Sequence, residues 1–181
     1  MARRRGPTDR GRRDRIAKAA VAVVAERGLE GLTHRAVAKA AAVPLGSTTY
    51  HFSDREEMLE AAMSEAAAET RRKIEAWAAA IGEGEDLVEA LADLLVRETS
   101  DGREMNVVAY ELYLAALKRP ALRPAAARWS ANLRLAIERF ADSLTAASLA
   151  AAAEGILVIS LASGGPVDRQ HATEILRRVA R

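Results

Sequence analysis

The amino-acid sequence predicts an all-α protein. Half of the 181 residues are hydrophobic, alanine is the most frequent residue, and only five prolines occur. Alanine has the highest helix propensity of all residues, whereas the β-branched residues that favour strands are sparse here. Apolar residues also recur every three or four positions over long stretches, which indicates amphipathic helices.

The composition argues against several classes of protein. The chain has no cysteine, so neither a disulfide framework nor a thiolate metal site is expected. No apolar run follows the first arginines, which argues against a signal peptide, and we expect no stretch of the roughly 20 apolar residues that span a bilayer. These observations predict a cytoplasmic protein without a membrane segment.

Positive charge is concentrated near the N-terminus. Residues 1–55 hold 12 of the 27 lysines and arginines but only 5 of the 25 aspartates and glutamates, which gives a net charge of +7. The remaining residues carry a net charge of −5. Such an asymmetry favours binding of a polyanion by the N-terminal part. The alternative is a solvated basic tail, because arginines near the N-terminus carry much of the excess.

Two segments precede the first motif. Residues 1–12 are basic and nearly free of apolar side chains, so we expect a disordered arm that can follow the phosphates of a nucleic acid. A first helix is expected over residues 13–27, and Gly28 ends it, since glycine is common just past a helix C-terminus. The buried stripe of this helix comprises Ile16, Ala20, Val23 and Val24.

The segment Leu32–Leu59 has the pattern of two short helices around a tight break. Thr33 is a suitable N-cap for the first of them, and Pro44 ends it because the residue before a proline is driven out of the α region. The second covers Gly46–His51 and carries hydroxyl, imidazole and phenol groups. Such a helix suits insertion into a DNA major groove, although an ordinary helical hairpin with a polar face is the simpler alternative.

Several groups in this segment are candidates for DNA contact. Arg35 lies at the start of the first short helix, and guanidinium is the side chain best suited to a guanine edge. The other candidates for base edges or thymine methyl groups are Leu45, Ser47 and Thr48. The predicted phosphate clamp comprises Thr33, Tyr50, His51 and Arg55. The complete predicted DNA-binding set is Thr33, His34, Arg35, Leu45, Gly46, Ser47, Thr48, Thr49, Tyr50, His51 and Arg55.

The same segment resembles a known family. Its motif consists of Gly31-Leu32-Thr33, Ala38, Val43, Gly46, His51-Phe52 and Arg55-Glu56. The spacing of these residues is similar to that of the TetR (tetracycline-repressor-like) family, closely from residue 16 to 59 and more loosely to the C-terminus. Three positions depart from the family pattern: Ala42 replaces a common glycine, Thr49 a common tyrosine, and Arg55 a common lysine.

This resemblance implies a function and an architecture. The fold would be all-α, with a three-helix DNA-binding head joined by a long helix to an effector-binding and dimerisation body. The function would be that of a sequence-specific transcriptional regulator, with a repressor as the expected type. It would bind its operator as a homodimer and be released by a small-molecule effector. The alternative is a helical DNA-binding dimer without an effector.

The body is expected to contain five helices besides a long one that it shares with the head. A long helix begins after the Ser53-Asp54 cap and continues to about Ile81, so it belongs to both the head and the body. Further helices are expected over residues 87–99 and 103–118, the second with Asn106 and Glu111 among apolar neighbours. Buried polar groups need partners, so both side chains should be hydrogen-bonded.

Residues 124–163 are compatible with one helix, but its length would exceed that of a compact domain of this size. We therefore expect a turn around Ser143–Ser148 that separates the helices Pro124–Leu144 and Leu149–Leu161. The resemblance implies that these two helices form the homodimer interface, and Gly155 would allow their close approach; a simple helix kink is the alternative. A short helix is expected over residues 167–181.

An effector pocket in the body is also implied by the resemblance. Its candidate lining comprises Trp77, Asn106, Tyr110, Tyr113, Trp129 and Asn132, the polar and aromatic residues among otherwise aliphatic helices. For each of them, ordinary core packing is the alternative. A ligand beside Trp77 would move the long helix and thereby the head. The sequence does not identify the effector.

Catalysis is disfavoured. The three histidines are His34, His51 and His171, and no phosphate loop, HExxH motif or nucleophile elbow accompanies them. No enzyme activity, cofactor or metal site is therefore expected. The predicted domains are a basic arm over residues 1–12, a helix-turn-helix domain over 13–55, and an effector-binding and dimerisation domain over 56–181.

Overall fold

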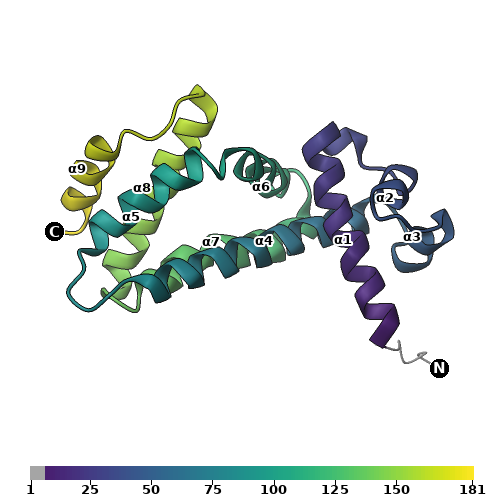
Figure 1. The fold of residues 1–181 in the computed structure, drawn as a ribbon, viewed down its shortest axis with the longest axis horizontal. Helices are drawn as coiled ribbons and strands as arrows, with labels where there is room; N and C mark the ends of the chain where they lie inside the picture. Colours follow the sequence, from purple (N-terminus) through teal and green to yellow (C-terminus); the bar gives the residue numbers. More distant parts are fainter. Residues whose placement is uncertain (1–6) are drawn as a thin grey trace. The chain divides into compact units, whose positions relative to one another are not determined.

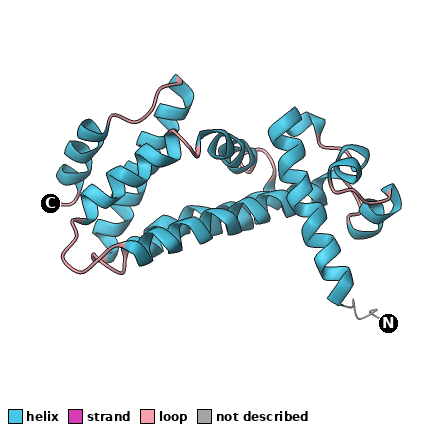
Figure 2. Ribbon diagram, viewed as in Figure 1, coloured by secondary structure: helices cyan, strands magenta, loops and turns pink. Residues whose placement is uncertain are grey.

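The computed structural model describes residues 7–181, with side chains from residue 11 onward. Helices are the only regular secondary structure in this part of the chain, as Figure 2 shows. The all-α prediction is thereby confirmed.

The chain forms two compact units. The first comprises the residues up to Ala67 together with Glu111–Ala126, and the second comprises Ala68–Tyr110 and Ala127–Arg181. The first unit therefore extends past the domain boundary expected at residue 55, and it includes a second segment from later in the chain.

The first unit contains the predicted helix-turn-helix. Its first elements are α1 (Pro7–Arg27), the 3-10 helix η1 (Leu29–Gly31), α2 (His34–Ala40) and α3 (Leu45–His51). Helix α1 packs against α2, and α2 packs against α3, which can be followed in Figure 1. Their apolar faces meet in a small core whose most deeply buried side chains include Ile16, Leu32, Val37 and Phe52.

Helix α1 begins six residues earlier than expected. The predicted start was residue 13, but the helix begins at Pro7. Proline suits the first position of a helix because its fixed φ is helical and its missing N–H would have no partner there. The prediction of a disordered arm is therefore wrong for residues 7–12, and residues 1–6 lie outside the described part of the chain.

Helix α4 (Arg55–Ala80) begins at a reciprocal cap, as the sequence predicts. The Glu57 N–H donates to Asp54 Oδ1 at 2.9 Å, and the Ser53 N–H donates to Glu57 Oε2 at 2.7 Å. These bonds satisfy two backbone donors that a helix start leaves without partners. The bond from Ser53 lowers the pKa of Glu57 below its ordinary value.

The second unit is built from the later helices. They are α5 (Leu87–Thr99), α6 (Arg103–Ala115), α7 (Arg123–Ile137), α8 (Ser143–Ser163) and α9 (Arg169–Val179), and a 3-10 helix, η2 (Pro120–Leu122), precedes α7. Helices α5, α8 and α9 pack against one another (Figure 1). The expected bounds of α5 are confirmed, whereas α6 ends three residues before residue 118. Helices α4, α6 and α7 each begin in one unit and end in the other.

The turn before α8 lies earlier than predicted. We expected it at Ser143–Ser148, but the turn follows Ile137 and α8 begins at Ser143. The reason is Asp142, whose Oδ1 accepts the N–H groups of Leu144 and Thr145, each at 3.0 Å. This aspartate is the N-cap, so the hydroxyl residues that suggested a turn lie inside the first helical turns.

Helix α8 also corrects the expectation that no segment could span a bilayer. Among residues 7–181 it is the one helix that is long and apolar enough, with a mean hydropathy of 1.8. Length and composition alone are weak evidence for a membrane segment, because the apolar helices of helical bundles share both properties.

The turn between α2 and α3 contains a strained residue. Ala42 has φ +52°, the left-handed conformation that side chains disfavour, and among the described non-glycine residues it alone has positive φ. It occupies the position at which the related family commonly has glycine. The side chain of Ala42 is exposed, so its methyl group contributes little packing to offset the strain.

Ala42→Gly should stabilise the protein by about 0.5–1 kcal/mol, because relief of the left-handed strain exceeds the entropy that glycine adds to the unfolded chain. Urea unfolding of both proteins measures this difference. Ala41→Gly is the matched control: Ala41 is buried with φ −77°, so its replacement should destabilise by about 1 kcal/mol. Equal or lower stability of Ala42→Gly would contradict the assignment of strain.

Candidate functional site

The outer side of the helix-turn-helix presents several of the predicted DNA contacts. Tyr50 is 61% exposed and Leu45 is 46% exposed, both on α3. Between residues 33 and 50, the exposed and half-exposed members of the predicted set are Thr33, His34, Arg35, Leu45, Gly46, Ser47, Thr49 and Tyr50. Thr33 is also the N-cap of α2, where its Oγ1 accepts the Ala36 N–H at 3.1 Å. These groups form the surface that we call the α2–α3 face.

Two predicted contacts face the interior instead, which corrects their assignment. Thr48 is 0% exposed, and its hydroxyl donates to the carbonyl of Leu45 at 2.8 Å. His51 is 3% exposed, and the ring of Tyr50 meets its imidazole edge to face. Residues three apart lie on the same side of a helix, so Thr48 and His51 share the buried side of α3. Neither side chain can reach a base or a phosphate from this position.

Arg55, predicted as a phosphate contact, is half-exposed and also has partners within the protein. Its guanidinium donates to the carbonyl of Leu32 at 3.1 Å and to that of Leu29 at 2.6 Å, and it lies 3.5 Å from the Glu30 carboxylate. Glu111 accepts the Leu29 N–H at 2.9 Å, which supplies the partner expected for this acid. Arg55 and Glu111 thus satisfy backbone polar groups in and beside the 3-10 turn.

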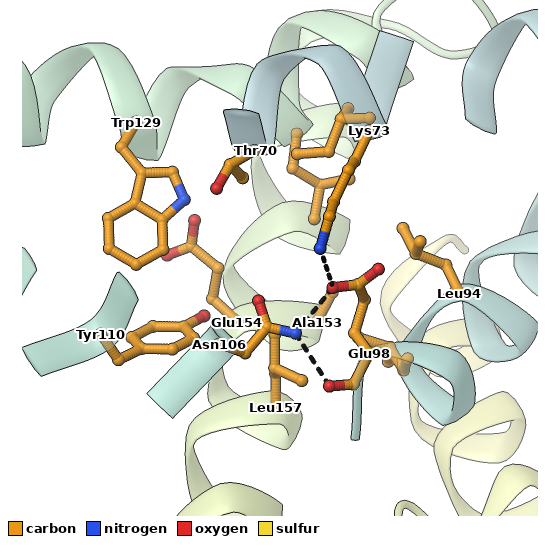
Figure 3. Close-up of a pocket in the computed structure, with 13 residues that line it drawn as sticks. Thr70, Lys73, Leu94, Glu98, Asn106, Tyr110, Trp129, Ala153, Glu154 and Leu157 are labelled. Carbon is orange, nitrogen blue, oxygen red and sulfur yellow. Dashed lines mark hydrogen bonds and ion pairs between the residues drawn. The ribbon is translucent and has the colours of Figure 1, made fainter. Parts of the chain in front are cut away.

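A cavity of about 60 Å³ lies within the second unit (Figure 3). Its walls come from α4, α5, α6, α7 and α8. The lining residues are Thr70, Lys73, Ile74, Leu94, Leu95, Glu98, Asn106, Tyr110, Trp129, Leu133, Ala153, Glu154 and Leu157. A largely apolar wall with a few converging polar groups is the usual composition of a small-molecule site.

Three of the six predicted pocket residues line this cavity, namely Asn106, Tyr110 and Trp129. The other three do not. Trp77 is 7% exposed in the apolar core, and its indole N–H donates to the Ala90 carbonyl at 3.1 Å. Tyr113 belongs to the first compact unit, and Asn132 lies outside the lining. Periodicity locates residues on a helix but does not distinguish the core face from the cavity face.

Aromatic rings form one wall of the cavity. The centroids of Tyr110 and Trp129 are 5.0 Å apart, with an angle of 51° between the ring planes. Figure 3 shows both rings beside the carboxylate of Glu154. Ring faces carry negative electrostatic potential, so a cation bound here would be attracted by the rings as well as by the acid.

Glu154 is the least compensated charged group of the cavity. Its carboxylate makes no hydrogen bond or ion pair with any residue that the structure describes. Burial raises its pKa above the ordinary value of 4.5. A carboxylate in such surroundings is unfavourable unless a ligand compensates it, which is why shifted acids in cavities are candidates for binding.

The second carboxylate, that of Glu98, is better satisfied. Its Oε2 accepts the Asn106 side-chain N–H at 2.6 Å, and the same amide donates to the Glu98 carbonyl at 2.8 Å. The ammonium group of Lys73 lies 3.7 Å from Glu98 Oε2. The three charged groups of the cavity are Lys73, Glu98 and Glu154, so its net charge is −1 when all are ionised.

Sequence reasoning missed all three of these charged residues. A signal for Glu154 is present in the sequence, because it is the only charged residue in the 21 residues of α8. A lone charge in an apolar helix is uncommon, and in a soluble protein it often has a binding role. Within residues 7–181, no cluster of three or more histidine, aspartate or glutamate side chains could hold a metal ion.

Comparison with family models assigns both parts of the chain. Residues 16–62 match the model described as bacterial regulatory proteins of the tetR family. Residues 82–181 match the model of the tetracyclin repressor-like C-terminal domain. A comparison with curated proteins returned no match.

Solved structures agree with these models over nearly the whole chain. The multidrug binding protein EbrR complexed with imidazole is 41% identical, with a TM-score of 0.83, and the match covers 93% of this chain and 94% of that one. EbrR complexed with ethidium is 41% identical, with a TM-score of 0.82 and coverage of 93% and 98%. A transcriptional regulator from Streptomyces coelicolor A3(2) is 31% identical, with a TM-score of 0.85 and coverage of 93% and 98%.

Glu154→Gln should raise the melting temperature at pH 8 and leave it unchanged near pH 4. An acid whose folded pKa is raised loses stability as the pH rises from the unfolded pKa through the folded pKa, and glutamine removes this loss. Calorimetry of both proteins across this pH range measures the difference. A stabilisation that is equally large near pH 4 would show that the buried charge is not its cause.

Proposed function

Since this chain belongs to the TetR family of bacterial regulatory proteins, and is therefore a DNA-binding transcriptional regulator with a ligand-binding C-terminal domain, we propose that it is a repressor that an aromatic cation releases from its operator. The cation would occupy the cavity that Glu154 lines. This proposal includes no catalytic step and places the protein in the cytoplasm with its DNA.

The observation that carries the proposed ligand class is the uncompensated carboxylate of Glu154 beside two aromatic rings. Of the cavity's two carboxylates, only that of Glu98 has a hydrogen bond or ion pair with another of the described residues. A ligand that combines positive charge with an aromatic body would satisfy both the acid and the rings of Tyr110 and Trp129. An anion would be repelled by the net negative charge of the cavity.

The solved relatives support this ligand class. EbrR is described in complexes with ethidium, proflavin and malachite green. Ethidium carries a permanent positive charge on a fused aromatic system, so its chemistry fits the groups present here. The proposal that this chain binds the same class of ligand rests on its own Glu154, Tyr110 and Trp129.

The size of the cavity suggests how a ligand would affect the protein. Pockets that hold drug-sized ligands measure about 300–1,000 Å³, whereas this cavity measures about 60 Å³. A ligand must therefore displace side chains and shift the helices that bear them, because packed interiors have little free volume. Three of these helices, α4, α6 and α7, also extend into the compact unit that contains α2 and α3. We propose that this continuity couples the ligand to DNA binding.

We propose that the functional unit is a homodimer formed through α7 and α8, as expected from the sequence. Large apolar side chains on these helices are exposed, among them Leu135 at 53%, Leu144 at 78% and Ile159 at 70%. A Cβ atom added to Gly155 would meet open space, which leaves room there for another helix. A dimer presents two recognition helices to two half-sites, and it explains the apolar character of α8 without a membrane.

The proposed ligand site can be tested with ethidium, whose fluorescence reports binding. We expect Glu154→Gln to weaken ethidium binding about tenfold or more, because the amide provides no counter-charge. Affinity of the wild type should fall as the pH drops toward the raised pKa of Glu154, and the variant should lack this dependence.

The control is Glu83→Gln, which removes the same charge from an exposed position outside the cavity. It should bind ethidium as the wild type does. Equal binding by wild type and Glu154→Gln, with the same pH dependence, would exclude Glu154 as the counter-charge.

DNA recognition can be tested on fragments selected for binding from a random pool. We propose that Arg35, Ser47 and Tyr50 of the α2–α3 face reach the DNA, since all three are exposed or half-exposed. Arg35→Ala should weaken binding by about 1–3 kcal/mol and relax the preference at one base pair of each half-site. A uniform loss for all sequences, with a shallower salt dependence, would make Arg35 a phosphate contact instead.

A further inference from the structure

The second carboxylate of the cavity, that of Glu98, already forms an ion pair with Lys73. The Lys73 ammonium lies 3.7 Å from Glu98 Oε2, and Figure 3 shows both side chains in the cavity wall opposite the Trp129 side. Lys73 comes from α4 and Glu98 from α5, so different helices bring the two charges together. The cavity thus contains one paired and one unpaired carboxylate.

We propose that Lys73 acts as an internal counter-ion that makes the cavity selective for ligands with a single positive charge. The inference rests on the proposed function, because it concerns the charge of the cation that Glu154 attracts. A monocation compensates Glu154 and leaves the pair of Lys73 and Glu98 intact. A dication meets only one uncompensated acid, unless it displaces the lysine from Glu98.

The geometry supports displacement of Lys73 from Glu98 as the step that a dication requires in order to bind. The Lys73 side chain is 37% exposed, so its ammonium can move into water while its methylene groups stay at the cavity. The Glu98 side chain is 21% exposed and its carboxylate accepts a hydrogen bond from the Asn106 amide, so it cannot follow the lysine outward as readily. After displacement, Glu98 would offer a positioned carboxylate to a second ligand charge.

Removal of the lysine charge should therefore change which ligands bind. In Lys73→Met the unbranched apolar side chain replaces the stem of lysine, and Glu98 keeps only the amide of Asn106. The net charge of the cavity changes from −1 to −2, which favours a dication over a monocation. Because the ammonium is partly exposed, solvent screening limits the effect to a modest factor.

Ethidium and propidium provide a matched pair of probes, since propidium is an ethidium analogue with a second, quaternary ammonium group. The quantity to measure is the ratio of ethidium Kd to propidium Kd at pH 8, by fluorescence titration of the full chain. We expect this ratio to rise about fivefold in Lys73→Met relative to the wild type. Any effect of the larger propidium side arm cancels, because each probe is compared with itself in the two proteins.

Two further variants identify the cause. Lys73→Arg keeps the positive charge and should keep the wild-type ratio. The double variant Lys73→Met with Glu98→Gln lacks the second carboxylate, so its ratio of ethidium Kd to propidium Kd should return to the wild-type value. Lys73→Gln provides a second neutral replacement, and it should behave like Lys73→Met if charge rather than packing is responsible.

The inference and the proposed function fail in different ways. The inference is overturned if the ratio of ethidium Kd to propidium Kd stays within a factor of two of the wild-type value in both Lys73→Met and Lys73→Gln. It is also overturned if the raised ratio of Lys73→Met persists in the double variant. In either case ethidium binding that depends on Glu154 would remain, and the proposed function would stand. Absence of ethidium and propidium binding to the wild type would instead overturn the proposed function.

Discussion

The uncompensated carboxylate of Glu154 is the interaction on which the ligand-binding part of this account depends. It lies in the wall of an apolar cavity, and burial raises its pKa because desolvation disfavours the charged form. Folding thus retains a group that is unfavourable without a ligand. A bound cation would reverse this effect, so the same residue limits stability and provides affinity. The rings of Tyr110 and Trp129 extend this preference to cations with an aromatic body.

The second constraint is that three helices run continuously through both compact units. Helices α4, α6 and α7 each belong partly to the unit with the α2–α3 face and partly to the unit with the cavity. In α6 the transition falls between adjacent residues: Tyr110 lines the cavity, while Glu111 accepts the Leu29 N–H of the first unit. A cavity that must expand to admit its ligand would therefore disturb helices that both units share. This arrangement gives the proposed response a physical route.

The sequence predicts the helices and the helix-turn-helix well because caps and breaks are local signals; Asp54, for example, marks the start of α4. It predicts side-chain roles less well, because a motif assigns residue types to positions but not their partners. Thr48 and Arg55 were predicted to contact DNA, yet backbone carbonyls of the protein accept their hydrogen bonds. The cap at Asp142 was overlooked because serine and threonine suit both turns and first helical turns. Glu154 was missed because its importance depends on neighbours from other helices.

The central claim is that a cation in the cavity and operator DNA oppose each other. The most direct measurement is the operator Kd with and without saturating tetraphenylphosphonium, an aromatic monocation that does not intercalate into DNA, after calorimetry has confirmed that it binds. We predict that this cation raises the operator Kd of the wild type about 5–150-fold, and that it leaves Glu154→Gln almost unaffected at the same concentration. If the cation binds through Glu154 and the operator Kd stays the same, ligand binding is not coupled to DNA binding and the account is wrong.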